Sequence, residues 1–299
     1  MASLATVEQS ALIQRPHASQ WKRRWGRFVA NRLSLVGLVV LVVLVLAALF
    51  GPPVISQSLG VEPNALSCNT LEPASGHHPL GCDPLGRDIL ARLAVGGRVS
   101  LLVGLLVALC TTVLGLVVGM SAGYFGGLTD SLLMRFTDTM LAMPTFFIVL
   151  AAAAFLGPNL FNTILIIGFT QWMATARLVR SQCLAIREKE YIIAARASGL
   201  TNARILRHIL PNVLPTVIVV ATLAVATGIL TESALSYLGL GIQPPHASWG
   251  SMLSGAQNYI FVAPLQGIYP GMLIMLTVLT VNFVGEGLRE VLDPRLSQS

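Results

Sequence analysis

The stretch LSLVGLVVLVVLVLAALF, residues 33–50, is an apolar run of eighteen residues without a charged side chain. As an α-helix, with a rise of about 1.5 Å per residue, it would extend about 27 Å, which is close to the thickness of the hydrocarbon core of a bilayer. Inside lipid the backbone must satisfy its own hydrogen bonds, so only helices and closed barrels span it. Because the run lacks the strict alternation of a barrel strand, it predicts a transmembrane helix.

Five more apolar runs follow, and they give the chain its class. They cover residues 99–122, 139–156, 160–179, 213–231 and 265–284. The whole sequence is 54% hydrophobic and 11% charged, whereas soluble domains carry roughly 25% charged residues. We therefore expect an all-α, polytopic membrane protein with about six transmembrane helices. The run at 160–179 is the weakest of the six because it contains Gln171 and Arg177.

The lysines and arginines are distributed unequally between the two sides of this predicted bundle. With six spans, 16 of the 19 fall on one side, in the N-terminal tail, at Arg135, in the segment 177–207 and in the C-terminal tail. The other side holds Arg87, Arg92 and Arg98. Cytoplasmic loops carry the excess of basic residues, so both termini and the segment 177–207 are predicted to be cytoplasmic. The net charge of +6 follows from this topology and gives no reason to expect a nucleic-acid partner.

The sequence divides into five segments by composition. They are a basic cytoplasmic tail at 1–32, the first transmembrane helix at 33–50, a proline-rich extracytoplasmic loop at 51–98, a core of five helices at 99–288 and a cytoplasmic tail at 289–299. Within the core, residues 183–212 form a cytoplasmic loop.

The extracytoplasmic loop contains two of the four cysteines, Cys68 and Cys82. An oxidising compartment would allow them to pair. Their spacing does not decide between a disulfide and two free thiols, because pairing depends on the geometry of the backbone.

Glycine and proline mark two places where the predicted helices depart from simple rods. Gly115, Gly119 and Gly123 recur at intervals of four, so they lie on one helix face where a second helix can approach closely. Pro144 should kink the span at 139–156 near its start.

Two acidic residues lie in or next to the apolar runs, where an ionisable group needs a partner. Asp138 follows Arg135 by three residues, which is the spacing of an ion pair on one helix face. Glu232 ends the fifth run near the outer surface. It either caps polar groups inside the bundle or faces an aqueous path.

Enzyme motifs are nearly absent from the sequence. No stretch matches a phosphate-binding loop, so we expect this chain to bind no ATP by that mechanism. His77 and His78 are adjacent, which does not place both on one helix face, and no metal site is predicted. Residues 119–123 match the Gly-x-Ser-x-Gly pattern of a hydrolase, which has meaning only at a strand-to-helix turn. A membrane hydrolase that uses Ser121 is therefore a remote alternative.

The stretch EYIIAARASGLTNARILRHILPN, residues 190–212, is a basic island between two apolar runs. Residues 186–198 are rich in helix formers, and Gly199 suits the left-handed position that ends a helix. A second helix would begin near residue 201 and end before Pro211. We therefore expect two short helices with a bend, exposed to the cytoplasm.

Three interpretations of this island compete. A helix-turn-helix that reads DNA has a similar outline, but the short tethers to the membrane would block access to the groove. The arginines fit a surface helix on anionic lipid. The small residues fit a docking element, because they let a partner approach the backbone closely; they are Ala194, Ala195, Ala197, Ser198 and Gly199. The residues alone leave the last two interpretations open.

The island resembles a motif of one family. Residues 190–199, continuing through RHILPN at 207–212, resemble the cytoplasmic signature loop of bacterial ABC importer permeases. The most similar form is that of the C-type permease subunit of dipeptide and oligopeptide importers. In the general motif a glutamate directly precedes the two alanines. Here Ile193 holds that place and Glu190 stands three residues earlier, as is usual in the peptide-importer branch.

Two further stretches resemble the same branch. HPLGCDPLGRD at 78–88 is similar to the loop after its first span, where a threonine is common in place of Cys82. LSYLGLG at 235–241, together with SWG at 248–250, is similar to the outer loop after its fifth span. The resemblance covers about residues 30–295, and its motifs are specific for the branch and weak for the substrate.

The resemblance implies a complex in the bacterial cytoplasmic membrane. This chain would pair with a second, homologous permease, two cytoplasmic ATPases and an extracytoplasmic solute-binding protein, surrounded by membrane lipid. The ATPases would bind ATP and Mg²⁺, and this chain would bind no cofactor. The loop 183–212 would then be the coupling element for one ATPase. The residues expected to couple are Glu190, Ala194, Ala195, Arg196, Gly199, Arg204 and Pro211.

The expected cargo of this complex is a di- or oligopeptide. The same machinery in closely related permeases imports nickel chelates, glutathione or haem, and these stay as alternatives.

Overall fold

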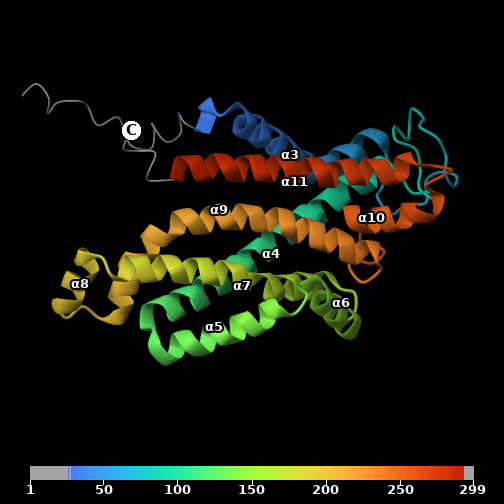
Figure 1. The fold of residues 1–299 in the computed structure, drawn as a ribbon. Helices are drawn as coiled ribbons and strands as arrows, with labels where there is room; N and C mark the ends of the chain where they lie inside the picture. The colour runs from blue at the N-terminus through green and yellow to red at the C-terminus, as the bar shows by residue number, and fades with distance from the viewer. Residues whose placement is uncertain (1–25, 27, 293–299) are drawn as a thin grey trace, which may run out of the picture.

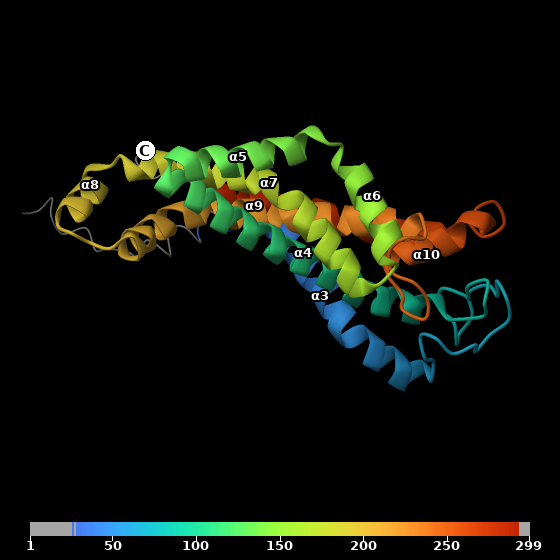
Figure 2. The same ribbon diagram turned by 90° about the horizontal axis from the view of Figure 1, so that it is seen from below.

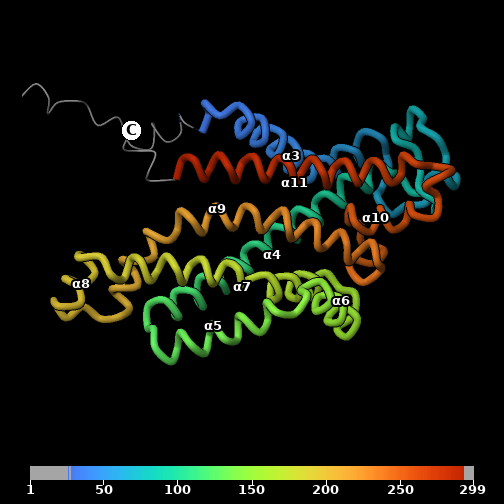
Figure 3. Tube along the Cα trace, in the orientation of Figure 1, coloured from blue at the N-terminus to red at the C-terminus, as the bar shows by residue number. Residues whose placement is uncertain are grey.

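The computed structural model describes residue 26 and residues 28–292, and its regular elements are helices (Figures 1 and 3). They are α3 (Arg32–Leu59), α4 (Ile89–Phe125), α5 (Gly127–Ala142), α6 (Thr145–Leu156), α7 (Leu160–Arg187), α8 (Glu190–Ala197), α9 (Asn202–Tyr237), α10 (Trp249–Ala256), a short 3₁₀ helix (Gln257–Tyr259) and α11 (Leu265–Leu292). The all-α class expected from the sequence is confirmed. Most of the basic tail at 1–32 and the last residues of the tail at 289–299 lie outside the described residues.

Helix α4 is the centre of an elongated bundle. It packs against α7 and α9, while α3 and α11 pack against each other along one flank. Figure 1 shows α8 at one end of the bundle and α10, with the loop before α4, at the other. Seen from below, α5 lies on the side of the bundle away from α3 (Figure 2).

Four described helices are long and apolar enough to cross a membrane: α3, α4, α9 and α11. The pair α5 and α6 makes a fifth if it counts as one span. Helix α7 has 28 residues, but it is less apolar because Gln171 and Arg177 interrupt its run. The helices therefore account for four or five of the six expected spans, and a crossing by α7 stays a prediction.

The kink expected at Pro144 is a complete break. Helices α5 and α6 meet there at 86°, so the expected kink is confirmed and is sharp enough to divide the run 139–156 between two helices. Met143 has φ −86° and ψ 137°, the extended conformation that sterics impose on a residue before proline. Pro144 then stands at the N-cap of α6, where its missing N–H removes no helical hydrogen bond.

Helix α3 continues to Leu59, beyond the expected end at residue 50, although Pro52 and Pro53 lie inside it. The two prolines cannot donate to the carbonyls four residues earlier, those of Ala48 and Leu49. Arg98 of α4 donates to both instead, from Nε to the first at 3.4 Å and from Nη2 to the second at 2.8 Å. A side chain of the neighbouring helix thus replaces two lost backbone bonds. The stretch outside helices shortens to residues 60–88.

The glycine face of α4 packs closely against α7, as expected. A Cβ at Gly119 would lie 2.7 Å from Cβ of Val179, and one at Gly123 would lie 2.7 Å from Cβ of Cys183. Gly115 approaches α7 in the same way. Carbon atoms in contact stay about 3.5 to 4.0 Å apart, so this interface admits no side chain on α4 at these three positions.

Candidate coupling site

Helix α8 is held to the end of the bundle by one apolar cluster (Figure 1). Ile192, the buried residue of α8, is 0% exposed and shares this cluster with Ile205 and Ile209 of α9. Tyr124 of α4 and Ile186 of α7 belong to the same cluster. Because three long helices contribute to the cluster, α8 is fixed to the bundle rather than attached by a free tether.

The bend after α8 is a Schellman motif. Gly199 has φ +75°, a left-handed conformation that glycine adopts at little steric cost. Its N–H donates to the carbonyl of Arg196 at 3.0 Å, and the N–H of Leu200 donates to that of Ala195 at 3.2 Å. No heavy atom other than those of its chain neighbours lies within 4 Å of the place of a Cβ. The bend therefore needs glycine for its backbone conformation and not for space.

Tyr124 connects the bend to the end of α4. Its hydroxyl donates to Oδ1 of Asn202, the first residue of α9, at 2.7 Å. The guanidinium of Arg196 lies 5.8 Å from the centroid of its ring, within range of a cation–π contact. The backbone carbonyl of Tyr124 accepts from Nη1 of Arg187 at 3.2 Å. Helices α7, α8 and α9 therefore all meet at this one residue.

The outward side of α8, of the bend and of the first turn of α9 is an exposed surface of small, apolar and charged side chains. We call it the α8 surface, and its members are Glu190, Tyr191, Ile193, Ala194, Arg196, Gly199 and Arg204. Tyr191 is 46% and Ile193 56% exposed. Among the other residues expected to couple, Ala195 is half-buried and Pro211 is exposed on α9.

Two expected boundaries in this region are wrong. Ile186 and Arg187 belong to α7, and α8 begins only at Glu190. Pro211 does not end the second helix, because α9 continues through it to Tyr237. The stripe of apolar residues that packs on the bundle continues across the proline and is buried on both sides of it; its members are Ile205, Ile209, Val213 and Val217. Burial of this stripe outweighs the backbone hydrogen bonds lost at Pro211 and at Pro215, the second proline inside α9.

The expected ion pair between Arg135 and Asp138 is also wrong. Oδ1 of Asp138 accepts from Nη2 of Arg177 on α7, and the two side chains are 58% and 52% exposed. Nearer the start of α5, Asp130 accepts from Nη2 of Arg180 at 2.6 Å. Both acidic residues therefore join α5 to α7 and do not pair within their own helix.

Glu232 is the hub of a buried polar network in α9. It is 0% exposed, and its carboxylate accepts from the hydroxyls of Ser236 at 2.7 Å and of Ser100 at 3.3 Å. Ser100 Oγ accepts in turn from the N–H of Trp249 at 3.1 Å, and Ser236 Oγ accepts from the N–H of Ile242 at 3.0 Å. The carboxylate thus links α4, α9 and the start of α10, which fits the capping role and not the aqueous one.

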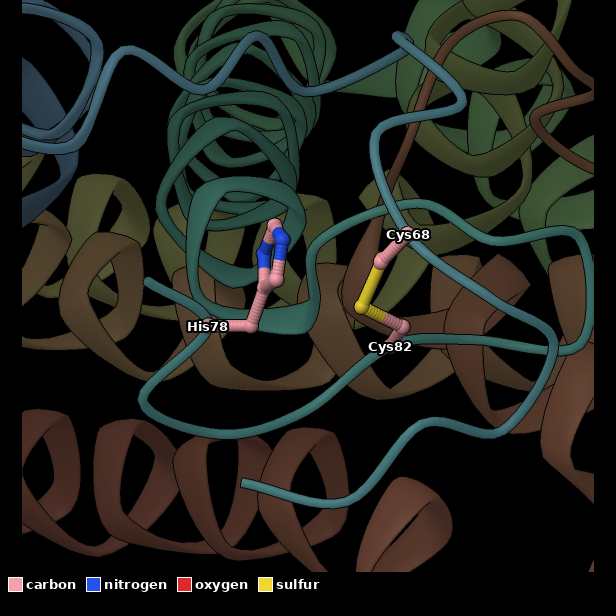
Figure 4. Close-up of side chains that lie close together, drawn as sticks. All are labelled: Cys68, His78 and Cys82. Carbon is pink, nitrogen blue, oxygen red and sulfur yellow. A yellow bond between two sulfur atoms is a disulfide. The ribbon is translucent and has the colours of Figure 1, made fainter. Parts of the chain in front are cut away.

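Cys68 and Cys82 form a disulfide, the pairing that their spacing left open (Figure 4). His78 lies beside the bond (Figure 4), and its Nδ1 is 2.9 Å from Oδ2 of Asp88. The other carboxylate oxygen of Asp88 accepts from the N–H of Ala91 at 2.7 Å and so caps α4. Because both sulfur atoms are bonded to each other and His78 is engaged, these residues brace the loop 60–88 rather than form a set of free metal ligands.

Comparison with known families decides the class of protein. Residues 115–298 match the family described as binding-protein-dependent transport system inner membrane component. Residues 19–65 match the N-terminal transmembrane domain of oligopeptide transport permease C. The chain belongs to this family of transport permeases. The resemblance to importer permeases is confirmed, and the permease is a multi-pass protein of the inner membrane.

Curated relatives match the permease over most of its length. The dipeptide transport system permease protein DppC of Alkalihalophilus pseudofirmus is 41% identical over 279 residues, which are 93% of this chain and 91% of the relative. The oligopeptide transport system permease protein OppC of Bacillus subtilis is 38% identical over 293 residues, or 98% and 95% of the two chains. OppC of Escherichia coli is 40% identical over 278 residues, or 93% and 92%.

The hydrolase alternative fails in this permease. Ser121 lies inside the continuous helix α4, whereas a nucleophile of this pattern stands on a turn between a strand and a helix. Gly119 and Gly123, which complete the pattern, are the packing surface against α7.

Two residues that organise the permease were missed by sequence reasoning. Tyr124 looks like any aromatic residue at the end of a span, and its contacts come from segments distant in the sequence. Trp249 is 2% exposed, and its Nε1 donates to the carbonyl of Leu93 at 3.0 Å. The motif at 248–250 pointed to this place, but the anchoring of α10 on α4 follows only from the fold.

Proposed function

We propose that this permease is one of two membrane subunits of an ATP-driven importer of di- or oligopeptides. The α8 surface is the observation that carries the proposal, because a fixed and exposed helix at one end of the bundle is suited to transmit force from a partner. The names of the relatives, which are dipeptide and oligopeptide transport permeases, support the class of cargo.

In this proposal α8 and both termini are cytoplasmic, and α8 docks in a groove on one of two ATPase subunits. The ATPases bind ATP and Mg²⁺, and this chain contributes no ATP site and no cofactor. Tyr191 and Ile193 supply apolar area for docking. Arg204 faces acidic groups of the partner, although an exposed ion pair contributes only about 0 to 1 kcal/mol. A solute-binding protein delivers cargo at the opposite end, where the loop 60–88 and α10 lie.

The coupling step is a rigid-body movement of α8. ATP binding closes the ATPases and displaces the surface on which α8 rests. Because Ile192 packs with Ile205 and Ile209, and Arg196 and Asn202 contact Tyr124, the displacement reaches α4, α7 and α9 together. The spans of this chain and of the homologous second permease then change between inward- and outward-open states. The population of each state depends on how strongly the partner subunits bind it.

The test is uptake into proteoliposomes that contain the complete complex with its solute-binding protein. The panel consists of labelled di-, tri- and pentapeptides, a nickel chelate, glutathione and haem. We expect ATP-dependent uptake of peptides, and the purified permease alone should hydrolyse no ATP. Uptake of only a non-peptide compound would contradict the proposed peptide cargo. Robust ATP turnover by the permease alone would contradict its role as a membrane subunit without an ATP site.

A further inference from the structure

A hollow of about 530 Å³ lies between the elbow of α5 and α6, the middle of α7 and the second half of α9. Most of its lining is apolar, but it also contains one amide and several hydroxyl groups. The polar lining residues used below are Gln171 of α7 and Thr227 and Thr231 of α9. Among the described residues that line the hollow, none is charged.

These three side chains form a small hydrogen-bonded set that joins α7 to α9. Nε2 of Gln171 donates to Oγ1 of Thr231 at 3.0 Å, and its Oε1 accepts from Oγ1 of Thr227 at 3.2 Å. Thr227 is exposed, and the other two are half-buried. The three side chains satisfy one another, and an amide or hydroxyl group can exchange such a bond for one to a ligand.

The polar groups of the hollow and the charged side chains next to it argue against lipid as its filling. Groups that need hydrogen bonds are costly against hydrocarbon, so in membrane proteins they face protein or water. The exposed ion pair of Asp138 and Arg177 lies next to the hollow, one turn along α5 from Leu141 and one turn along α7 from Met173, which both line it. By contrast, α3 exposes a continuous apolar surface on the other side of the bundle; its members include Val36, Val39, Val43 and Leu46.

We propose that this hollow is the contribution of this chain to the translocation path, and that it binds backbone amide groups of a peptide in transit. The inference rests on the proposed function. A peptide backbone offers one donor and one acceptor at each residue, and Gln171, Thr227 and Thr231 supply the complementary groups. Because the lining carries no charge, it holds the backbone without selecting the charge of the side chains. Exchangeable neutral hydrogen bonds also let the peptide leave.

The first experiment introduces a charge into the hollow and compares it with the same change elsewhere on α7. Gln171→Glu should lower uptake of an acidic tripeptide about tenfold relative to a basic one, because the added carboxylate repels a like charge at close range. The control is Gln182→Glu. Gln182 makes the same kind of bond, from Nε2 to Oγ1 of Thr216 at 2.9 Å, but it lies outside the hollow. Its ratio of acidic to basic uptake should equal that of the wild type.

The outcomes separate this inference from the proposed function. If the wild-type complex imports no peptide, the function itself fails. If it imports peptides and the two variants keep the same ratio of acidic to basic uptake, the inference fails while the function stands.

The second experiment measures access of water and needs no transport. Thr227→Cys and Val43→Cys are made in a background in which the free cysteines, Cys110 and Cys183, are replaced by alanine. The variants are labelled in the assembled complex with a charged methanethiosulfonate. We expect the thiol at 227 to react about tenfold faster or more than the thiol at 43, because a charged reagent does not enter hydrocarbon, and bound peptide should protect it. Equal, slow labelling at both positions would show that lipid or the second permease fills the hollow, and would overturn the inference.

Discussion

At Gly199 the coupling region depends on a backbone angle. A β-branched residue at φ +75° is strained by about 1 to 2 kcal/mol or more, and the strain is relieved by reorienting α8. We therefore predict that Gly199→Val inserts normally, as judged by its level in washed membranes, but loses most peptide uptake. Gly199→Asn is the matched control, because asparagine tolerates this conformation better. Normal uptake by an inserted Gly199→Val variant would contradict the role of the bend.

Glu232 should contribute to stability through the hydrogen bonds that its carboxyl group accepts. Removal of the carboxylate in Glu232→Ala leaves the hydroxyls of Ser100 and Ser236 without their acceptor in a dry site. We expect a loss of about 3 kcal/mol, measured as a lower Tm of the purified permease in detergent. Glu232→Gln keeps one carbonyl acceptor and should lose less. An unchanged Tm for the alanine variant would show that the network is not structural.

The sequence showed which acidic residues needed partners, but it predicted the wrong partner for Asp138 and no specific partner for Glu232. Asp138 and Glu232 stood out because an ionisable group near lipid depth requires compensation. The partner of Asp138 is Arg177 on another helix, and Ser100 is 132 positions away from Glu232. Spacing rules cover neighbours on one helix, so contacts between helices lie beyond them.

At the scale of elements, Arg98 allows a helix to continue through two prolines. We predict that the effects on stability of changing Arg98 and of changing the two prolines are coupled, and a double-mutant cycle detects this coupling. Arg98→Met alone should lower the Tm, because the carbonyls of Ala48 and Leu49 lose their donor. With both Pro52 and Pro53 changed to alanine, backbone N–H groups return, and the same Arg98→Met change should cost about 1 kcal/mol less. Equal losses in the two backgrounds would contradict the compensation.

Helix positions were largely predictable from the apolar runs, whereas helix ends at prolines were not. The runs at 33–50 and 265–284 each lie inside one observed helix. A proline ends a helix only when nothing else stabilises its continuation. At Pro211 a buried apolar stripe stabilises α9, which continues through the proline. At Pro144 the helix ends, and the next helix begins at an angle of 86° to it. The sequence contains the prolines, but the tertiary contacts decide between these outcomes.

In the whole molecule, the two ends of the helical bundle carry different features. The α8 surface lies at one end, and the disulfide-braced loop and α10 lie at the other (Figure 1). The hollow is lined by α5, α6, α7 and α9, between these two ends. The unequal distribution of lysine and arginine predicts that the α8 end faces the cytoplasm, and the signature residues predict that α8 is the coupling element; both stay predictions. The fixation of α8 through Ile192 and Tyr124 was not predictable, because it depends on four segments that meet only in the folded protein.

Site-specific photo-cross-linking tests whether α8 is the docking element for an ATPase subunit. A photoreactive amino acid is placed at Ile193 on α8 or, as a control, at Val43 on α3, both more than half exposed. The complete complex is irradiated in membranes, and the products are identified by mass spectrometry. We expect an ATPase adduct from position 193 and none from position 43. The absence of an ATPase adduct at 193, with lipid adducts in its place, would contradict this role of α8.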